Sequence, residues 1–332
     1  MIPRLQGFLS LTYQLPNVAP RVLGRNPLEI DRLSTDLTGY VGFRSTGAEM
    51  RGNSAFDIAL WDIFGKATGQ PIAQLLSGFT RREIRTYNTC AGTEYIKNST
   101  GQTIANFGLG GDNQYDDLNG FLHHADELAL SLLEEGITGM KIWPFDAAAE
   151  KTDGISISLT DLKAALEPFE KIRRAMGDKM DIMVELHSKW QLLPALQIAR
   201  AFKPYNTFWH EDPIRMDSLY SLKRYAQATT APFAAPETLG GRGAFRDLLE
   251  TGVADVIILD ISWCGGRSCQ VDGCAVKAEC CAWPLKVIPN HETCLICPPS
   301  VPAGYHSTGG LVVFPLHPEF SGYRGSYGAA GN

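Results

Sequence analysis

Three glutamates end β-like runs at equal intervals along the chain. Glu185 stands in MVELH, Glu211 in WHEDP and Glu237 in APETL, and 26 residues separate each neighbouring pair. If each interval holds one strand and one helix, the three carboxylates project from successive strands into one pocket. Any one of these acids alone is more often a solvated loop residue, and their shared register is what favours a site. Carboxylate oxygens are the ligands that Mg²⁺ prefers, so the series predicts a magnesium site.

Two further residues end the next two β-like runs. Asp260 closes DVIILD and His291 closes LKVIPNH. A carboxylate on one strand can orient an imidazole on the next and raise its basicity, which makes this pair a candidate general acid/base dyad. A lone histidine at such a place is more often a surface residue, and the preceding carboxylates favour the dyad. His187 follows Glu185 by two residues and therefore lies on the same side of its strand.

After residue 80 the chain alternates β-like runs with amphipathic helical stretches, which is typical of parallel strand–helix–strand units. The predicted strands are 84–89, 139–145, 181–187, 207–212, 232–237, 255–260 and 285–291, with 311–316 as a candidate substitute for a last strand. Such units over roughly 250 residues predict a TIM-type (β/α) barrel, whose catalytic groups lie where the strands end. A doubly wound open sheet is the competing fold, but the GxGxxG turn expected after its first strand is absent.

Helix boundaries also have local signals. The apolar face of the segment 117–136 stops at Gly136, and Ser158 with Asp161 resembles a capping pair at the start of the next helix. Residues 54–69 predict another helix, whose apolar face carries Ala55, Phe56, Ala59, Leu60, Ile63 and Phe64. We therefore expect a separate, mainly helical piece at 1–83, the barrel at 84–316 and an irregular tail at 317–332.

The composition is that of a soluble globular protein and excludes several classes of partner. With 332 residues and a formal charge of −6, the chain has no basic stripe to neutralise nucleic-acid phosphates. No stretch approaches the ~20 apolar residues of a membrane span, and the first residues lack a secretory core, so we expect a cytoplasmic protein. Seven of the eight cysteines fall between Cys264 and Cys297, a spacing that favours reduced thiols over disulfides or structural zinc.

Several longer motifs occur in order along residues 15–265. They are NSAFDIALWDIFGKATGQPIAQLLSG, GITGMKIWPFD, DIMVELH, FWHEDPI and APETLGGRGAFRDLLETGVADVIILDISWCGG, with IPNHETC following. In these motifs the chain resembles the mandelate racemase/muconate lactonising family of the enolase superfamily, and within it the acid-sugar dehydratases such as galactonate dehydratase. The resemblance implies an N-terminal α+β capping domain, here truncated, and a barrel in which Mg²⁺ stabilises an enediolate formed by removing a proton α to a carboxylate.

The resemblance also implies roles for individual residues. Matched by motif, the magnesium ligands are Glu185, Glu211 and Glu237, and the acid/base dyad is Asp260 with His291. His187 matches the acid that protonates the departing hydroxyl of a sugar acid. By the same resemblance the substrate is a small carboxylate and the protein is a homo-oligomer.

The chain departs from the family pattern at Trp143. The family commonly has Lys-x-Lys at the end of the second strand, whereas this chain has Lys141-Ile142-Trp143. Lys141 can still pair with a substrate carboxylate, and Trp143 can line the substrate site but cannot accept a proton. A racemase needs acid/base groups on both faces of the carbon, so the substitution favours dehydration to a 2-keto-3-deoxy acid.

Other departures keep further interpretations open. Glu185 stands where an aspartate is more usual, and the segment RSCQVDGCAVKAECCAWPLKV after Gly266 replaces a more usual alanine-rich helix. An epimerase or cycloisomerase using the same site is the nearest alternative. A catalytically silent homologue or fragment is the alternative from another class, and the atypical C-terminal region is its main support.

Overall fold

The computed structural model of the chain describes residues 18–38, 48–76, 86–91, 117–235, 237–258, 264–265 and 310–312. The chain divides into two compact units. The first comprises 1–84, 237–250 and 258–307, and the second comprises 85–236, 251–257 and 308–332. In the described part of the chain, no helix is both long and apolar enough to cross a membrane.

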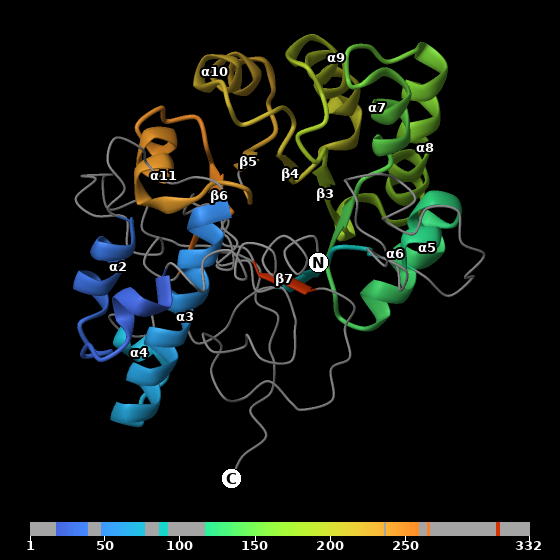
Figure 1. Ribbon diagram of the computed structural model, residues 1–332. Helices are drawn as coiled ribbons and strands as arrows, with labels where there is room; N and C mark the ends of the chain where they lie inside the picture. Colours follow the sequence, from blue (N-terminus) through green and yellow to red (C-terminus); the bar gives the residue numbers. More distant parts are fainter. Residues whose placement is uncertain are drawn as a thin grey trace. The chain divides into compact units, whose positions relative to one another are not determined.

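The second unit is built on a curled sheet of seven strands in the order β6-β5-β4-β3-β2-β1-β7 (Figure 1). The strands are β1 Thr86–Asn88, β2 Gly139–Ile142, β3 Asp181–Glu185, β4 Trp209–Glu211, β5 Phe233–Ala235, β6 Val256–Ile257 and β7 Gly310–Val312. Consecutive strands from β1 to β6 pair in parallel. The sheet is thus a parallel half-barrel, which confirms the predicted α/β class.

The observed strands are shorter than the predicted runs. The run 139–145, for example, forms a strand only as far as Ile142. Pro144 lacks the N–H that a further ladder bond needs, so the chain turns there. The run at 311–316 contributes β7, which pairs antiparallel with β1 instead of in parallel. The predicted strand 285–291 lies outside the described residues.

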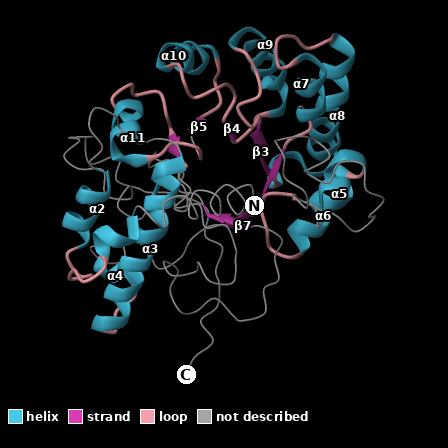
Figure 2. Cartoon of the chain, viewed as in Figure 1, coloured by secondary structure: helices cyan, strands magenta, loops and turns pink. Residues whose placement is uncertain are grey.

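Helices lie on the outer side of the curled sheet and connect its parallel strands (Figure 2). In the second unit they are α5 Asp117–His123, α6 Ala125–Glu134, α7 Asp146–Thr152, α8 Leu159–Met176, α9 Leu192–Phe202 and α10 Leu219–Ala228, with 3₁₀ turns at Gly177–Lys179 and Lys203–Tyr205. Helix α6 packs on α8, and α9 packs on α10. Strands β2, β3 and β4 therefore each end at a loop that leads into a helix, and these loops carry the candidate site.

Two predicted helix boundaries are confirmed. The Ser158 hydroxyl accepts a hydrogen bond from the Asp161 backbone N–H at 3.0 Å, which caps the start of α8. After α6 the chain reaches Gly136 with φ of +84°, a left-handed conformation that favours glycine. Each signal acts within one helical turn, so it can be recognised from the local sequence.

Aromatic rings fill the space between the sheet and its helices. Phe202 of α9 lies 5.1 Å from Phe169 of α8 and 4.9 Å from the His210 ring of β4, measured between centroids. His210 is 1% exposed, and its two ring nitrogens lie 2.9 Å from the Thr207 hydroxyl and 2.8 Å from the Tyr225 hydroxyl. Because side chains alternate along a strand, His210 faces the helices and its neighbour Glu211 faces the inside of the half-barrel.

The first unit contains α2 Ile30–Thr38, α3 Ala48–Thr68, α4 Ile72–Leu75 and α11 Gly241–Leu249. Its core includes Leu33 of α2 and Leu60 and Trp61 of α3. The predicted apolar face of α3 is partly wrong, because Ile63 is 42% exposed while Asp57 is buried. Asp57 accepts a hydrogen bond from the Ser34 hydroxyl at 3.0 Å, so a polar contact between α2 and α3 replaces an apolar one.

The buried His210 predicts a pH-dependent stability. Burial lowers the pKa of His210 to about 3, so the folded chain holds a neutral ring that the unfolded chain protonates below its ordinary pKa near 6.5. The unfolded state then binds more protons, and stability falls as the pH falls. We expect His210 to account for about 2 kcal/mol of lost unfolding free energy between pH 7 and pH 5.

Urea denaturation at the two pH values measures this loss. The His210→Asn variant is less stable at pH 7, but its stability falls by about 2 kcal/mol less than that of the wild type on going to pH 5. The exposed His123 lies in α5, and His123→Asn is the matched control, which keeps the wild-type difference. Equal losses in wild type and His210→Asn would contradict a neutral, buried His210.

Candidate active site

Three charged side chains from consecutive strands meet at the C-terminal edge of the half-barrel. Lys141 is the last residue but one of β2, Glu185 ends β3 and Glu211 ends β4. Lys141 is paired in register with Met183, and Glu185 with Glu211. Since residues two apart on a strand share a face, the three side chains project from the same face of the sheet. The predicted convergence of Glu185 with Glu211 is therefore observed.

The ammonium of Lys141 bridges the two carboxylates. Its Nζ lies 2.9 Å from Oε2 of Glu185 and 2.6 Å from Oε1 of Glu211. The remaining oxygens accept bonds from the His187 backbone N–H at 2.8 Å and from the Trp209 indole N–H at 3.1 Å. Glu185 is 2% exposed and Glu211 is fully buried. Two buried carboxylates thus share one cation and two neutral donors.

The charges at this edge shift the pKa values of neighbouring groups. Burial alone would raise the pKa of Glu185, but the positive charges of Lys141 and His187 outweigh it and hold this pKa well below its usual range. Burial alone would lower the pKa of His187, yet the carboxylates of Asp146 and Glu185 raise it above the usual value. The site therefore keeps Glu185 ionised and favours a protonated imidazole beside it.

The loop after β3 holds His187 in an uncommon backbone conformation. His187 and Ser188 have φ of +50° and +56°, a left-handed geometry that costs of order 1–3 kcal/mol for each non-glycine residue. The loop is held by the bond from His187 to Glu185 and by the Ser188 N–H, which donates to the Asp212 carbonyl at 2.7 Å. Backbone strain of this kind is typical of residues that a site must orient.

The Trp143 ring packs against His187 at the C-terminal edge of the half-barrel. The Trp143 ring is 3% exposed and meets the His187 ring edge-on with 5.4 Å between centroids. On its other side it contacts Phe121 of α5 at 5.5 Å, and its indole N–H donates to the Thr89 carbonyl at 3.4 Å. The ring is held by packing, and its contact with a substrate stays a prediction.

Two polar residues of this edge escaped the sequence analysis. The fully buried carboxylate of Asp146, at the start of α7, lies 2.9 Å from Nδ1 of His187 and 3.3 Å from Nζ of Lys189. Asp146 sits four residues after the end of β2 and Lys189 four after the end of β3, so each looked like an ordinary loop residue. The only available signal was that both belong to loops at the catalytic ends of their strands.

The other predicted ligand and the predicted dyad are not among the described residues of the second unit. Glu237 is half-buried in the turn that follows β5 in the chain, and it belongs to the first unit. Asp260 and His291 lie outside the described residues. Within the ranges that are described, no cluster of three or more histidine, cysteine, aspartate or glutamate side chains is placed to hold a metal ion.

The donor chemistry of Glu185 and Glu211 nevertheless fits a hard divalent cation. Both side chains offer only oxygen ligands, and the four carboxylate oxygens accept the bonds from Lys141, the His187 N–H and the Trp209 indole. The place between them already accommodates the positive charge of Lys141. These two carboxylates are the described residues that would contribute to holding such a cation.

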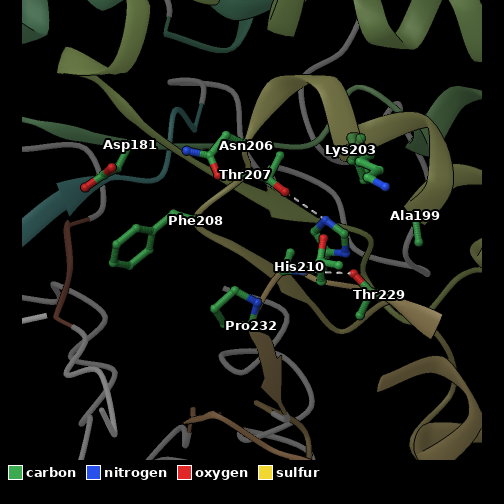
Figure 3. Close-up of a pocket in the computed structure, with 12 residues that line it drawn as sticks. Asp181, Ala199, Lys203, Asn206, Thr207, Phe208, His210, Thr229 and Pro232 are labelled. Carbon is green, nitrogen blue, oxygen red and sulfur yellow. Dashed lines mark hydrogen bonds between the residues drawn. The ribbon is translucent and has the colours of Figure 1, made fainter. Parts of the chain in front are cut away.

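A cavity of about 320 Å³ lies at the other edge of the sheet (Figure 3). Its wall includes Asp181 at the start of β3 and Phe208 and Pro232, which precede β4 and β5. His210 and Thr207 also line it, and the Thr207 hydroxyl lies 2.9 Å from Nε2 of His210. The N-terminal ends of barrel strands are concerned with stability in this architecture, so the cavity is not a candidate for the catalytic centre.

Removing the Lys141 charge tests how strongly the two carboxylates depend on it. In Lys141→Met, Glu185 and Glu211 keep their burial but lose their shared cation. We expect a loss of about 3–5 kcal/mol in unfolding free energy at pH 7, measured by urea denaturation. The loss is smaller at pH 4, because the variant can then protonate Glu185, whereas the wild type gains its stability from the ionised form as the pH rises.

The matched control is Lys151→Met, which breaks an exposed pair with Asp161 in the same unit. The Lys151 side chain is 62% exposed, and an exposed ion pair contributes little to stability, so this change should cost far less than Lys141→Met. A Lys141→Met loss no larger than that of the control, or one that is equal at pH 4 and pH 7, would contradict the buried charge triad.

Both the N-terminal and the C-terminal part of the chain match known protein families. Residues 124–298 match the family described as enolase C-terminal domain-like. Residues 9–77 match the mandelate racemase/muconate lactonizing enzyme N-terminal domain. The capping and barrel domains expected from the sequence are therefore both represented.

Individual relatives agree with these matches. A D-gluconate dehydratase from Thermoproteus tenax is 27% identical over 322 residues, which are 96% of this chain and 55% of the relative. A D-galactonate dehydratase from Ralstonia nicotianae is 27% identical over 249 residues, 75% of this chain and 57% of the relative. The chain thus spans little more than half the length of these curated relatives.

Solved structures give a higher identity. An enolase of the mandelate racemase subgroup from Agrobacterium tumefaciens is 60% identical, with a TM-score of 0.68 over 83% of this chain and 67% of that one. An enolase protein from Sargasso Sea environmental sequencing is 37% identical, with a TM-score of 0.69 over 84% of this chain and 68% of that one. The barrel-domain match alone spans more than half of the 332 residues, so the chain belongs to the mandelate racemase/muconate lactonizing enzyme family of the enolase superfamily.

Proposed function

We propose that this protein is a magnesium-dependent dehydratase of a sugar acid, an aldonate such as galactonate. The observation that carries the proposal is the pair of buried carboxylates, Glu185 and Glu211, joined by Lys141 at the C-terminal edge of the half-barrel. His187, held two residues beyond Glu185, adds an acid to the same edge. The curated relatives named as gluconate and galactonate dehydratases support the substrate class.

The metal would be held by Glu185 and Glu211, with Glu237 as the third proposed ligand. A bound Mg²⁺ supplies positive charge that stabilises the enediolate form of the substrate carboxylate. Lys141 contributes a further positive charge at the same edge, and we assign it to the substrate carboxylate. Because Glu185 and Glu211 are almost completely buried, their charges act there with little screening by water.

Two histidines divide the proton transfers. His291, oriented by Asp260, takes the proton from the carbon α to the carboxylate. His187 gives a proton to the β-hydroxyl, whose carbon–oxygen bond breaks so that the hydroxyl leaves as water. The resulting enol becomes the 2-keto-3-deoxy acid. This assignment gives the roles of base and acid to two different residues, so that each acts on its own carbon.

An epimerase is the weaker candidate because of Trp143. Epimerisation needs a second proton-transferring group on the opposite face of the carbon, and an indole ring cannot accept a proton. Trp143 is also packed between Phe121 and His187, so it serves as a wall of the site. Dehydration needs one base and one acid, and the proposed residues provide both.

A panel of hexonates tests the reaction class. We expect the wild-type protein to release a 2-keto acid from at least one hexonate when Mg²⁺ is present and to release none after chelation with EDTA. Glu211→Gln removes one ligand charge and should abolish both release and Mg²⁺ binding by calorimetry. Glu167→Gln alters an exposed ion pair on α8 and is the control that keeps both. Mg²⁺ binding without release from any hexonate would instead favour the catalytically silent homologue.

Separate measurement of α-proton exchange in D₂O and of 2-keto acid release tests the two histidines. His291→Asn should lose both, because no α-proton is removed. His187→Asn should keep exchange while release falls by a factor of about 100 or more, the usual contribution of a general acid. Unchanged exchange in His291→Asn would remove that residue as the base, and unchanged release in His187→Asn would remove His187 as the acid.

A further inference from the structure

Asp146 belongs to a second cluster of charged side chains, beside the carboxylate pair, and it takes no part in the proton transfers proposed for the reaction. Its Oδ2 lies 2.9 Å from Nδ1 of His187 and 3.3 Å from Nζ of Lys189. Lys189 also lies 2.9 Å from Oε1 of Glu150, one helical turn further along α7. The cluster therefore joins the start of α7 to the loop after β3.

These groups are buried, so the cluster is not an exposed ion pair at the protein surface. Asp146 is fully buried, and the side chains of His187 and Lys189 are only 13% and 11% exposed. A carboxylate taken out of water at such a place is costly unless a positive group or a hydrogen-bond donor lies next to it. Here Lys189 and the imidazole both contact the same oxygen, so the contact to His187 is one of two that hold Asp146.

The His187 ring is constrained from three directions. Its backbone is fixed in the left-handed region and tied to Glu185, Trp143 packs edge-on against one side of the ring, and Asp146 engages Nδ1. With Nδ1 occupied, a proton passed to a substrate has to leave from Nε2. A carboxylate on one imidazole nitrogen is the usual means of fixing both the ring orientation and the tautomer.

We propose that Asp146 is a positioning residue for His187 and that Lys189 holds Asp146 in place. The proposal rests on the dehydratase function proposed above. In the elimination step, Nε2 of His187 gives its proton to the β-hydroxyl, the carbon–oxygen bond breaks with its electron pair going to oxygen, and water leaves. His187 is then the neutral tautomer that keeps its proton on Nδ1, facing Asp146. Asp146 itself takes up no proton.

Asp146→Asn tests this arrangement, because the amide keeps the shape of the side chain and removes its charge. We expect 2-keto acid release to fall by roughly 100-fold, as expected for loss of general-acid assistance, while α-proton exchange in D₂O changes less than about twofold. Asp146→Asn combined with His187→Asn should be no slower than His187→Asn alone. Equal falls in exchange and release would show a merely structural role and overturn the proposal, as would an unchanged release.

Asp153→Asn is the matched control at the other end of α7. Asp153 is exposed and has φ of +51°, a conformation that asparagine also adopts readily. This variant should keep the wild-type rates of both exchange and release. The control removes a charge near α7 that does not contact His187, so a difference between the two variants is due to the contact of Asp146 with His187.

A spectroscopic measurement tests the proposal without a substrate. In ¹⁵N-histidine-labelled wild-type protein at alkaline pH, where histidines are neutral, the His187 signals should show the proton on Nδ1. His187→Gln identifies these signals, and Asp146→Asn should shift the tautomer toward Nε2. A wild-type His187 protonated on Nε2 would overturn the proposal even if Asp146→Asn failed to fold. If no hexonate were turned over, the proposed dehydratase function would be contradicted. The tautomer of His187 would still show whether Asp146 orients the ring.

Discussion

The contact between Lys141 and the two carboxylates is the interaction on which the described site depends. Parallel pairing in register brings Glu185 and Glu211 side by side at the ends of β3 and β4, where both are removed from water. Two unpaired negative charges in that position would oppose folding, and a buried ion pair rarely stabilises a protein more than apolar groups of the same size would. The buried charges are therefore better explained by a role in the reaction proposed for this edge than by a contribution to stability.

This constraint extends into the loop that follows β3. Glu185 uses one oxygen to hold the His187 backbone, and the neighbouring Ser188 is tied to the carbonyl of Asp212 after β4. The left-handed conformation of His187 and Ser188 persists because bonds to two strand ends compensate for its cost. The carboxylate proposed to hold a metal thus also sets the direction of the proposed acid.

The two edges of the half-barrel have different tasks. At the C-terminal edge, charged side chains are buried in contact with one another and shift each other's pKa values. Around the cavity at the N-terminal edge, the charge of His210 is avoided, because burial lowers the pKa of the ring and keeps it neutral. His210 and Glu211 are neighbours in β4 that point to opposite faces of the sheet, so one strand contributes to both environments.

The sequence by itself determined the class of fold and the order of its strands and helices, and it placed Glu185 and Glu211 at the ends of strands. Period-two and helical patterns, Gly136 and the cap at Ser158 act over a few residues, so they were readable without coordinates. The spacing of 26 residues between Glu185 and Glu211 likewise fits one strand–helix unit, and motif resemblance correctly indicated the family. The apolar face of α3 was assigned less well, because the polar contact with α2 depends on a partner 23 residues away.

Only the tertiary structure decided which side chains meet. Lys141 and Glu185 are 44 residues apart, and their contact depends on the register between β2 and β3, which no local pattern specifies. The pairing of Asp146 with His187 was likewise invisible, because two loops bring them together after separate strands. Spacing along a chain indicates which residues lie near the ends of strands, whereas distances between loops arise from register, burial and backbone conformation acting together.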